Sequence, residues 1–247
     1  MAGHSHWAGI KHKKGRADKV RSKIFSKLSK EITVAAKLGD KDPDMNPRLR
    51  SAIQAARAAN MPKDNIERAI KKSYDENAEN YESVRYEGFG IEGVGIIVET
   101  LTDNRNRTAG DIRSIFSKHG GNLGETGSVS FMFNHVGIIK FSEKAGSFDD
   151  IFDIAIEAGA LDCDTLDDEY EISCPKDNLH QFAENIENKI SEDITAQLTW
   201  KPSNQISLNK EKAIKIIEMI EVLEDHDDVQ DVFANFELPE DIFNELQ

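Results

Sequence analysis

The electrical charge of this 247-residue chain is divided sharply between two parts. Residues 1–73 hold eighteen Lys and Arg against seven Asp and Glu, a net charge of +11, whereas residues 74–247 carry −25. The basic excess is greatest at the start, where residues 1–30 contain nine Lys and Arg but a single acid, Asp18. A split of this size predicts that the two parts have different partners. The basic part suits phosphates, and the acidic part repels nucleic acid unless it faces away from it.

Several classes of protein do not fit this sequence. No apolar run approaches the ~18 residues of a transmembrane helix, and residues 1–14 lack the apolar core of a secretory signal. The two cysteines, Cys163 and Cys174, are too few for a disulfide framework and lack the closely spaced partners of a zinc site. We therefore expect a cytoplasmic protein with no membrane partner and no metal.

The basic part has the periodicity of three helices. The first, from about Ala17 to Leu38, has an apolar face of Val20, Ile24, Leu28, Ile32 and Ala35. On its other side is a stripe of five lysines: Lys19, Lys23, Lys27, Lys30 and Lys37. Asn46 and Pro47 predict the start of a second helix, and Pro62 that of a third, through Lys72. Residues 1–16 show no periodicity and are interpreted as a flexible arm.

The acidic part alternates strands and helices. We expect strands at 94–101, 128–133, 136–141, 169–174, 194–200 and 229–236, and helices at 104–119, 147–158, 175–189 and 209–223. This order predicts an α+β fold: an N-terminal small helical bundle followed by two ferredoxin-like α/β domains of βαββαβ type, the second inserted in the first. The predicted domains are a basic head at 1–80, an α/β domain at 81–134 plus 204–247, and the inserted domain at 135–203.

Other patterns that could carry chemistry have simpler interpretations. Residues 88–93 match G-x-G-x-x-G, but a strand follows where a dinucleotide site needs a helix, so we expect a glycine-rich turn. The acidic run 162–169 lacks the Gly and Glu of an EF-hand loop, and 225–228 is a similar acidic loop. The run at 162–169 is interpreted as a solvated acidic hairpin, with a metal-dependent hydrolase as the alternative, and 225–228 is interpreted as a solvated loop. The sequence gives no positive support for an enzyme, a cofactor or a small-molecule substrate.

One group of residues favours nucleic acid as the partner. Its members are Trp7, Lys11, His12, Lys13, Lys14, Arg16, Lys19, Arg21, Lys23, Lys27, Lys30 and Arg48. A cationic arm can enter a groove or an RNA crevice, while a cationic helix follows backbone phosphates. Trp7 either stacks on a base or anchors the arm to the bundle. Ionic contacts alone carry little sequence information, and no known groove-reading module matches.

The chain resembles the YebC/PmpR family. The residues that carry the resemblance are 1–7, 10–14, 23–28, 46–50, 60–70, 86–90, 101–108, 120–124 and 127–133. The likeness is strong to about Phe133, and beyond it rests on the layout of the elements. His6, Gly9 and the Ile91-Glu92 pair depart from the family's usual residues, which affects details of the arm and of one turn.

The resemblance implies a cytoplasmic bacterial family with an organellar branch, built from a helical head and two α/β domains, without enzymatic activity or cofactor. Its members are customarily described as transcriptional regulators that bind promoter DNA. A competing view makes them ribosome-associated factors that bind ribosomal RNA near the peptidyl-transferase centre and relieve stalling at proline runs. We therefore predict a DNA-binding transcriptional regulator. The ribosome-associated factor is the first alternative, and an adaptor that binds proteins through its acidic body is the second.

Overall fold

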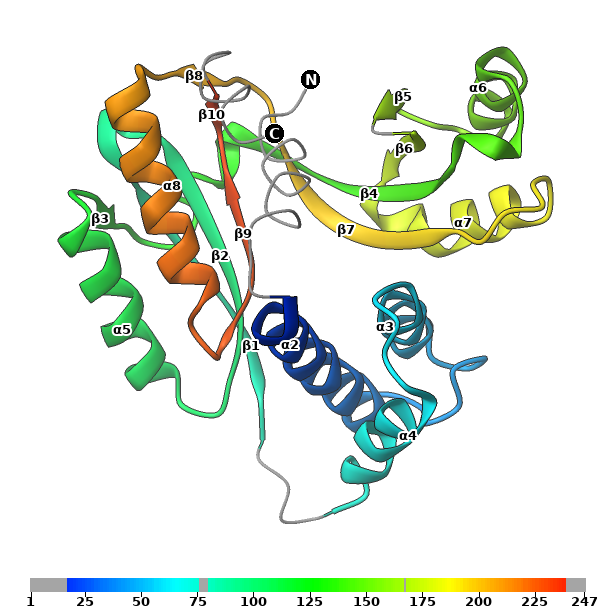
Figure 1. The fold of residues 1–247 in the computed structure, drawn as a ribbon, viewed down its shortest axis with the longest axis horizontal. Helices are drawn as coiled ribbons and strands as arrows, with labels where there is room; N and C mark the ends of the chain where they lie inside the picture. Colours follow the sequence, from blue (N-terminus) through cyan, green and yellow to red (C-terminus); the bar gives the residue numbers. More distant parts are fainter. Residues whose placement is uncertain (1–16, 76–79, 167, 239–247) are drawn as a thin grey trace. The chain divides into compact units, whose positions relative to one another are not determined.

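The computed structural model describes residues 17–75, 80–166 and 168–238, with side chains from residue 21 onward (Figure 1). Three helices, α2 (Ala17–Leu38), α3 (Pro47–Ala58) and α4 (Lys63–Lys72), precede two four-stranded antiparallel sheets. This confirms the predicted α+β class with a helical N-terminus. Among the described residues, no helix is long and apolar enough to cross a membrane.

The described residues form two units, and the boundary between them lies within α2. The first unit contains α2 as far as Lys30 together with the first sheet. The second contains Glu31–Tyr74 and the second sheet. The three predicted domains, at 1–80, 81–134 with 204–247, and 135–203, therefore remain a prediction, because α2 contributes residues to both units.

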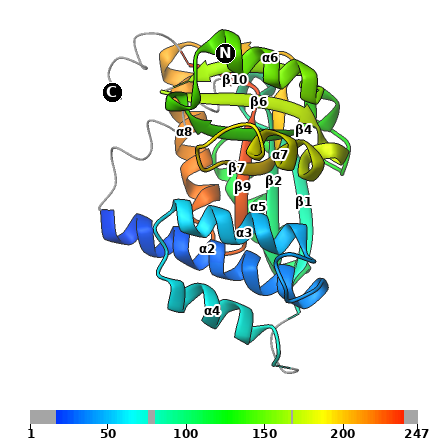
Figure 2. The same cartoon turned by 90° about the vertical axis from the view of Figure 1, so that its right-hand side faces the viewer.

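The helices of the head begin and end where their local sequence indicates. Asn46 caps α3, since its side-chain oxygen accepts the Leu49 N–H at 3.1 Å, and Pro47 occupies the first helical position. In the second unit, α3 and α4 lie beside the later part of α2 (Figure 2). The Thr33 hydroxyl donates to the Ala69 carbonyl at 2.9 Å, which joins α2 to α4.

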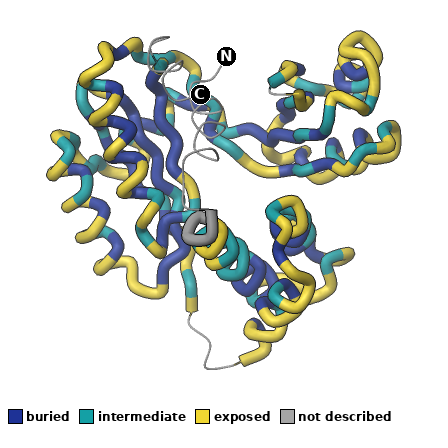
Figure 3. The backbone as a smooth tube through the Cα atoms, in the orientation of Figure 1, coloured by how far each residue is buried: buried dark blue, intermediate teal, exposed yellow. Residues whose placement is uncertain are grey.

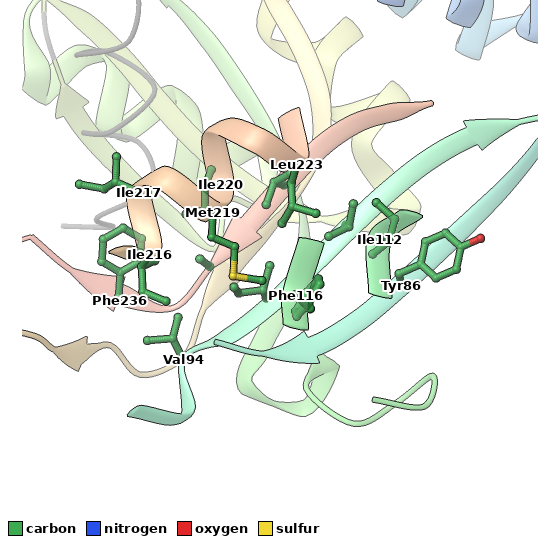
Figure 4. Packing of buried hydrophobic residues seen from close by; sticks show 14 of the residues in the cluster. Tyr86, Val94, Ile112, Phe116, Ile216, Ile217, Met219, Ile220, Leu223 and Phe236 are labelled. Carbon is green, nitrogen blue, oxygen red and sulfur yellow. The ribbon is translucent and has the colours of Figure 1, made fainter. Parts of the chain in front are cut away.

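The first sheet has the strand order β3-β1-β2-β9. Its strands are β1 (Glu82–Phe89), β2 (Gly95–Thr102), β3 (Asn122–Leu123) and β9 (Val229–Ala234). Helices α5 (Arg105–Lys118) and α8 (Lys210–Glu224) pack on one face. Figure 4 shows Phe116 of α5 and Met219 of α8 among the side chains of this core.

Strand β1 was not expected from the sequence. It forms a hairpin with β2, through a turn that contains Glu92 at φ 59° and Gly93 at φ 77°. The G-x-G-x-x-G pattern at 88–93 is thus the end of a strand and a hairpin turn, which confirms the interpretation as a glycine-rich turn. Because of this hairpin, the first sheet opens with two strands before its first helix, rather than with the strand–helix order of a βαββαβ unit.

The second sheet follows the ferredoxin-like order in full. Its elements are β4 (Phe133–Ser142), α6 (Phe148–Ala158), β5 (Asp162–Leu166), β6 (Glu169–Pro175), α7 (Leu179–Glu187) and β7 (Thr195–Pro202). They give the order β5-β6-β4-β7. The strand expected at 128–133 is instead a short 3₁₀ turn, η2 (Ser130–Met132), at the beginning of β4. Strands β8 (Ile206–Ser207) and β10 (Phe236–Glu237) form a separate parallel pair.

Burial follows the strands and the inner faces of the helices in each unit (Figure 3). The acidic run at 162–169 is the β5–β6 hairpin, and the carboxylates of Asp162 and Asp164 are more than half exposed. The Lys201 ammonium lies 2.9 Å from Asp162 and 3.9 Å from Asp164. This confirms the interpretation of the run as a solvated hairpin. The described residues contain no group of three or more His, Cys, Asp or Glu placed to hold a metal ion.

Candidate nucleic-acid interface

The structure describes the side chains of five of the twelve residues predicted to bind nucleic acid. Trp7, Lys11, His12, Lys13, Lys14 and Arg16 lie outside the described residues. Lys19 belongs to α2, but its side chain is also outside the described set. The residues that can be placed are Arg21, Lys23, Lys27, Lys30 and Arg48.

Two lysines of the α2 stripe contact neighbouring parts of the first unit: Lys23 contacts the segment that joins α8 to β9, and Lys27 contacts β9 itself. The Lys23 ammonium lies 2.5 Å from a carboxylate oxygen of Asp225 and donates to the Asp225 carbonyl at 3.1 Å. The Lys27 ammonium donates to the Gln230 carbonyl at 3.2 Å. The one-turn spacing of Lys23 and Lys27 places both ammonium groups on the same side of the helix. Their positive charge is therefore already shared with oxygen atoms of the first unit.

Lys30 is held more tightly than the other lysines of the stripe. Its ammonium donates to the carbonyls of Leu101 at 3.3 Å and Asp227 at 3.1 Å, and to the Asp228 carboxylate at 3.2 Å. It also lies 4.8 Å from the centre of the Tyr81 ring. The side chain is only 15% exposed. Its ammonium thus has three oxygen partners inside the first unit, and a phosphate has little access to it.

Asp228 is the centre of a buried polar cluster. Its carboxylate accepts hydrogen bonds from Thr108 at 2.7 Å, Arg107 at 3.0 Å and Thr102 at 3.2 Å, in addition to Lys30. Burial by itself raises the pKa of this carboxyl, but the hydrogen bonds from Thr108, Arg107 and Lys30 outweigh burial and bring the pKa to about 2. The interpretation of 225–228 as a solvated acidic loop is wrong for Asp228, which is 5% exposed.

The residues that follow β2 both cap the start of α5 and contact the Asp228 cluster. Asn104 caps α5 by accepting the Arg107 N–H at 3.1 Å. The Arg107 guanidinium bridges Asp103 at 2.6 Å and Asp228 at 3.0 Å, and these hydrogen bonds raise its pKa. No local pattern signals the cluster, because Asp228 is separated from Thr108 by 120 positions and from Lys30 by 198.

Arg48 and Arg21 differ in their surroundings. Arg48 forms two hydrogen bonds with the Glu31 carboxylate, at 2.6 and 3.0 Å, and this pairing raises its pKa. Arg21 is exposed. Of the five predicted residues whose side chains are described, Arg21 is the one that forms no hydrogen bond or ion pair. The structure therefore places Lys23, Lys27 and Lys30 together in one set of contacts in the first unit, and it places Arg48 in a separate pair in the second.

The fold and these contacts define an α+β protein in which a basic helical N-terminus precedes two antiparallel sheet domains. The chain belongs to the TACO1/YebC family. Residues 5–76 match the family described as "TACO1/YebC protein N-terminal domain", and residues 81–236 match "TACO1/YebC second and third domain". This confirms the resemblance noted in the sequence.

Two known proteins are similar over nearly their whole length. A "probable transcriptional regulatory protein" of Pelagibacter ubique (strain HTCC1062) is 57% identical over 235 residues, which cover 95% of this chain and 98% of that protein. The crystal structure of a conserved hypothetical protein from Aquifex aeolicus is 46% identical, with a TM-score of 0.83, covering 95% of this chain and 97% of that one. The first is named as a regulatory protein and the second as a conserved hypothetical protein.

Proposed function

We propose that this chain is a DNA-binding transcriptional regulator of the YebC type, that it acts in the cytoplasm, and that it catalyses no reaction. The observation that carries the proposal is the concentration of nine Lys and Arg in residues 1–30 of a chain whose remainder is strongly acidic. Clustered cations of this kind bind phosphate backbones and release counterions. The name of the Pelagibacter relative supports a regulatory role.

The proposed contacts are divided between two groups of residues. Trp7, Lys11, His12, Lys13, Lys14, Arg16, Lys19 and Arg21 contact the nucleic acid directly. Lys23, Lys27 and Arg48 join only by exchanging their present oxygen partners for phosphates, and Lys30 chiefly holds α2 against the first unit. The division predicts that neutralising the arm weakens binding more than neutralising the same number of lysines within α2.

Salt dependence tests the electrostatic mechanism. With about half of the nine cations engaged, the logarithm of the affinity for duplex DNA should fall with the logarithm of the salt concentration at a slope of roughly −4. Fluorescence anisotropy with labelled duplex DNA measures this slope. A variant with Gln in place of Lys11, Lys13, Lys14 and Arg16 should show a markedly shallower slope. A slope near zero for the natural chain would show that phosphate contacts do not drive binding.

A ribosome-associated translation factor is the second candidate function. It is favoured by an exposed aromatic side chain, Tyr74, that lies next to cations and suits unpaired bases better than a duplex. Sedimentation with ribosomes and a promoter-DNA gel shift, both at about 0.15 M salt, compare the two candidates. Retention on ribosomes without a DNA shift selects the second candidate, and the reverse selects the first.

The same arm variant separates both candidates from an adaptor that binds proteins through its acidic body. A nucleic-acid-binding regulator should lose its DNA or ribosome association when the arm is neutralised, and should keep any protein partner. An adaptor should show the opposite pattern. Lys30 is left unchanged in this variant, because its loss would disturb Asp228 and the first unit.

A further inference from the structure

The second half of α4 carries three cations that have no hydrogen-bond or ion-pair partner among the described residues. Arg68, Lys71 and Lys72 are all exposed. Across the part of the chain that the structure describes, no carboxylate or carbonyl oxygen is recorded within hydrogen-bond or ion-pair distance of their charged groups. Their spacing of three and four residues places them on one face of the helix. This distinguishes them from Arg48 in the same unit, whose guanidinium is paired with Glu31.

An exposed aromatic ring follows these cations directly. Tyr74 is 59% exposed, and the Lys41 ammonium lies 3.9 Å from the centre of its ring. The backbone at this position is fixed, because the Tyr74 N–H donates to the Lys71 carbonyl at 3.0 Å. The Ser73 hydroxyl also donates to the Ile70 carbonyl at 2.7 Å. The ring is therefore presented at a defined place beside the cations. We call Lys41, Arg68, Lys71, Lys72 and Tyr74 the α4 surface.

The carboxylates nearest in sequence to Lys41 are directed into their own loop. Asp40 accepts the Asp42 N–H at 2.8 Å, and Asp42 accepts the Asp44 N–H at 3.0 Å. Hydrogen bonds of this kind fix the loop from which Lys41 reaches the Tyr74 ring. Of the charged side chains in this loop, Lys41 is thus the one that belongs to the α4 surface.

The position of the cations has a partial explanation in the helix itself. The dipole of the helix backbone stabilises positive side chains in the last turn, where Lys71 and Lys72 lie. The dipole does not account for a large aromatic ring kept in solvent with an ammonium group against it. Cations beside an exposed ring are the combination by which proteins bind single strands, where cations follow the phosphates and rings stack on unpaired bases.

We propose that the α4 surface binds single-stranded nucleic acid. Arg68, Lys71 and Lys72 contact consecutive phosphates, and a base that is not paired stacks on Tyr74 while Lys41 stays beside the ring. The inference rests on the nucleic-acid binding that both candidate functions share, and it names the class of nucleic acid that the α4 surface takes. A duplex cannot offer this contact, because its bases are already stacked and paired.

Binding of short labelled oligonucleotides to the full chain tests the proposal. The probes are single-stranded RNA, single-stranded DNA and duplex DNA of one sequence, on the order of ten nucleotides long. Fluorescence anisotropy should show tighter binding of the single strands. Tyr74→Ala should weaken that binding about tenfold or more, whereas Tyr74→Phe, which keeps the ring, should bind like the natural chain.

A matched pair of charge variants completes the experiment. Replacing Arg68, Lys71 and Lys72 with Gln should make the salt slope for single strands shallower by about 2, since each phosphate contact contributes about 0.7. The control replaces Lys118, Lys144 and Lys176 with Gln, which removes the same charge from other exposed positions. This control should leave the slope nearly unchanged. Circular dichroism verifies that all variants are folded.

The outcomes distinguish the inference from the proposed function. One outcome is that the natural chain binds with a steep salt dependence while Tyr74→Ala and the triple Gln variant bind single strands as tightly as it does. In that case the α4 surface is not the site, and the proposed function stands. A clear preference for the duplex would also overturn the inference alone. If the natural chain binds none of the three probes at any salt concentration, and longer probes of the same three kinds also fail to bind, both proposals are wrong.

Discussion

At the scale of single residues, the carboxylate of Asp228 accepts hydrogen bonds from four side chains of the first unit. Its carboxylate is the shared acceptor of side chains from α2, the end of β2 and the first turn of α5. If this acceptor is removed, two cations and two hydroxyls lose a partner, and Lys30 is largely shielded from the water that could replace it. A change at this residue should therefore affect the whole unit.

We expect Asp228→Asn to lower the free energy of unfolding at pH 7 by roughly 2–4 kcal/mol. The amide cannot neutralise Lys30 and Arg107, although it keeps the shape of the side chain. Urea denaturation followed by circular dichroism measures the change. The control is Asp227→Asn, one position earlier, because Asp227 is exposed and contributes only its backbone carbonyl. A loss for Asp228→Asn no larger than for this control would show that the cluster does not stabilise the unit.

The depressed pKa of Asp228 also predicts a dependence of stability on pH. The carboxyl has a pKa of about 2 in the folded chain and of about 3.9 when unfolded. The stabilisation, about 2–3 kcal/mol, is fully present above about pH 5 and is lost as the pH falls from about 5 to 1. Denaturation midpoints measured from pH 6 to pH 2 should fall less steeply for Asp228→Asn than for the natural chain. Equal pH profiles would contradict the low pKa.

At the scale of elements, Asn46 determines how α2 and α3 meet. Its side-chain oxygen caps α3, and its amide donates to the carbonyls of Ala35 at 2.8 Å and Asp40 at 2.6 Å. The turn before it needs Gly39, because a Cβ there would come within 2.6 Å of the Asn46 amide nitrogen. One buried side chain thus satisfies the start of one helix and the end of the preceding one.

Two substitutions at Asn46 separate these roles. Asn46→Ala removes the cap and both donated hydrogen bonds, and should cost about 2–3 kcal/mol of unfolding free energy. Asn46→Asp keeps the capping oxygen but turns the donor into an acceptor that faces two carbonyls, so it should also destabilise the chain. Thermal denaturation compares the two variants. If Asn46→Asp is as stable as the natural chain, the cap alone matters and the bonds to Ala35 and Asp40 contribute nothing.

The contact between α2 and the α8–β9 segment links stability to the proposed function. Asp225 neutralises Lys23 in the folded chain, so a phosphate must compete for that ammonium group. Asp225→Asn should strengthen nucleic-acid binding a few-fold at low salt, and the gain should shrink as salt rises. Asp227→Asn is the matched control, since it removes the same charge without releasing a lysine from a carboxylate. Equal gains in the two variants would indicate a general charge effect instead of competition for Lys23.

At the scale of the whole molecule, the division of α2 between two units contrasts with the predicted separate head. Lys23, Lys27 and Lys30 hold the first part of α2 in the first unit, whereas Thr33 and the residues after it belong to the second. Cleavage between Tyr74 and Tyr81 should therefore leave the N-terminal fragment bound to the rest of the chain.

A protease that cuts after glutamate tests this expectation, because Glu76 and Glu79 lie in the connection. We expect the first cut there, and co-elution of the two fragments in gel filtration under native conditions. Raising the salt concentration should not separate them fully, since Lys30 and Asp228 are largely shielded from water. A fragment that elutes alone would instead support the separate head at 1–80.

The sequence by itself determined the features that depend on neighbouring residues. Periodicity located α2, the Asn46-Pro47 pair located the start of α3, and the alternation after residue 135 predicted the ferredoxin-like order of the second sheet. These features are local because a helix face repeats every three or four residues and a cap acts within one turn. Strand β1 was missed, since its glycine and its charged residues do not have the composition of a buried strand.

Only the tertiary structure decided which charges are available to a partner. The sequence predicts that the lysine stripe of α2 is one surface for phosphates. In the structure, three of its members contact oxygens in the first unit, and the side chain of Lys30 is only 15% exposed. Arg68, Lys71 and Lys72 looked ordinary in the sequence, yet they have no recorded partner among the described residues. The physical reason is that a charge is neutralised by whatever lies within a few ångströms of it. For Lys30 that neighbour is Asp228, 198 positions away, which only the folded chain brings near.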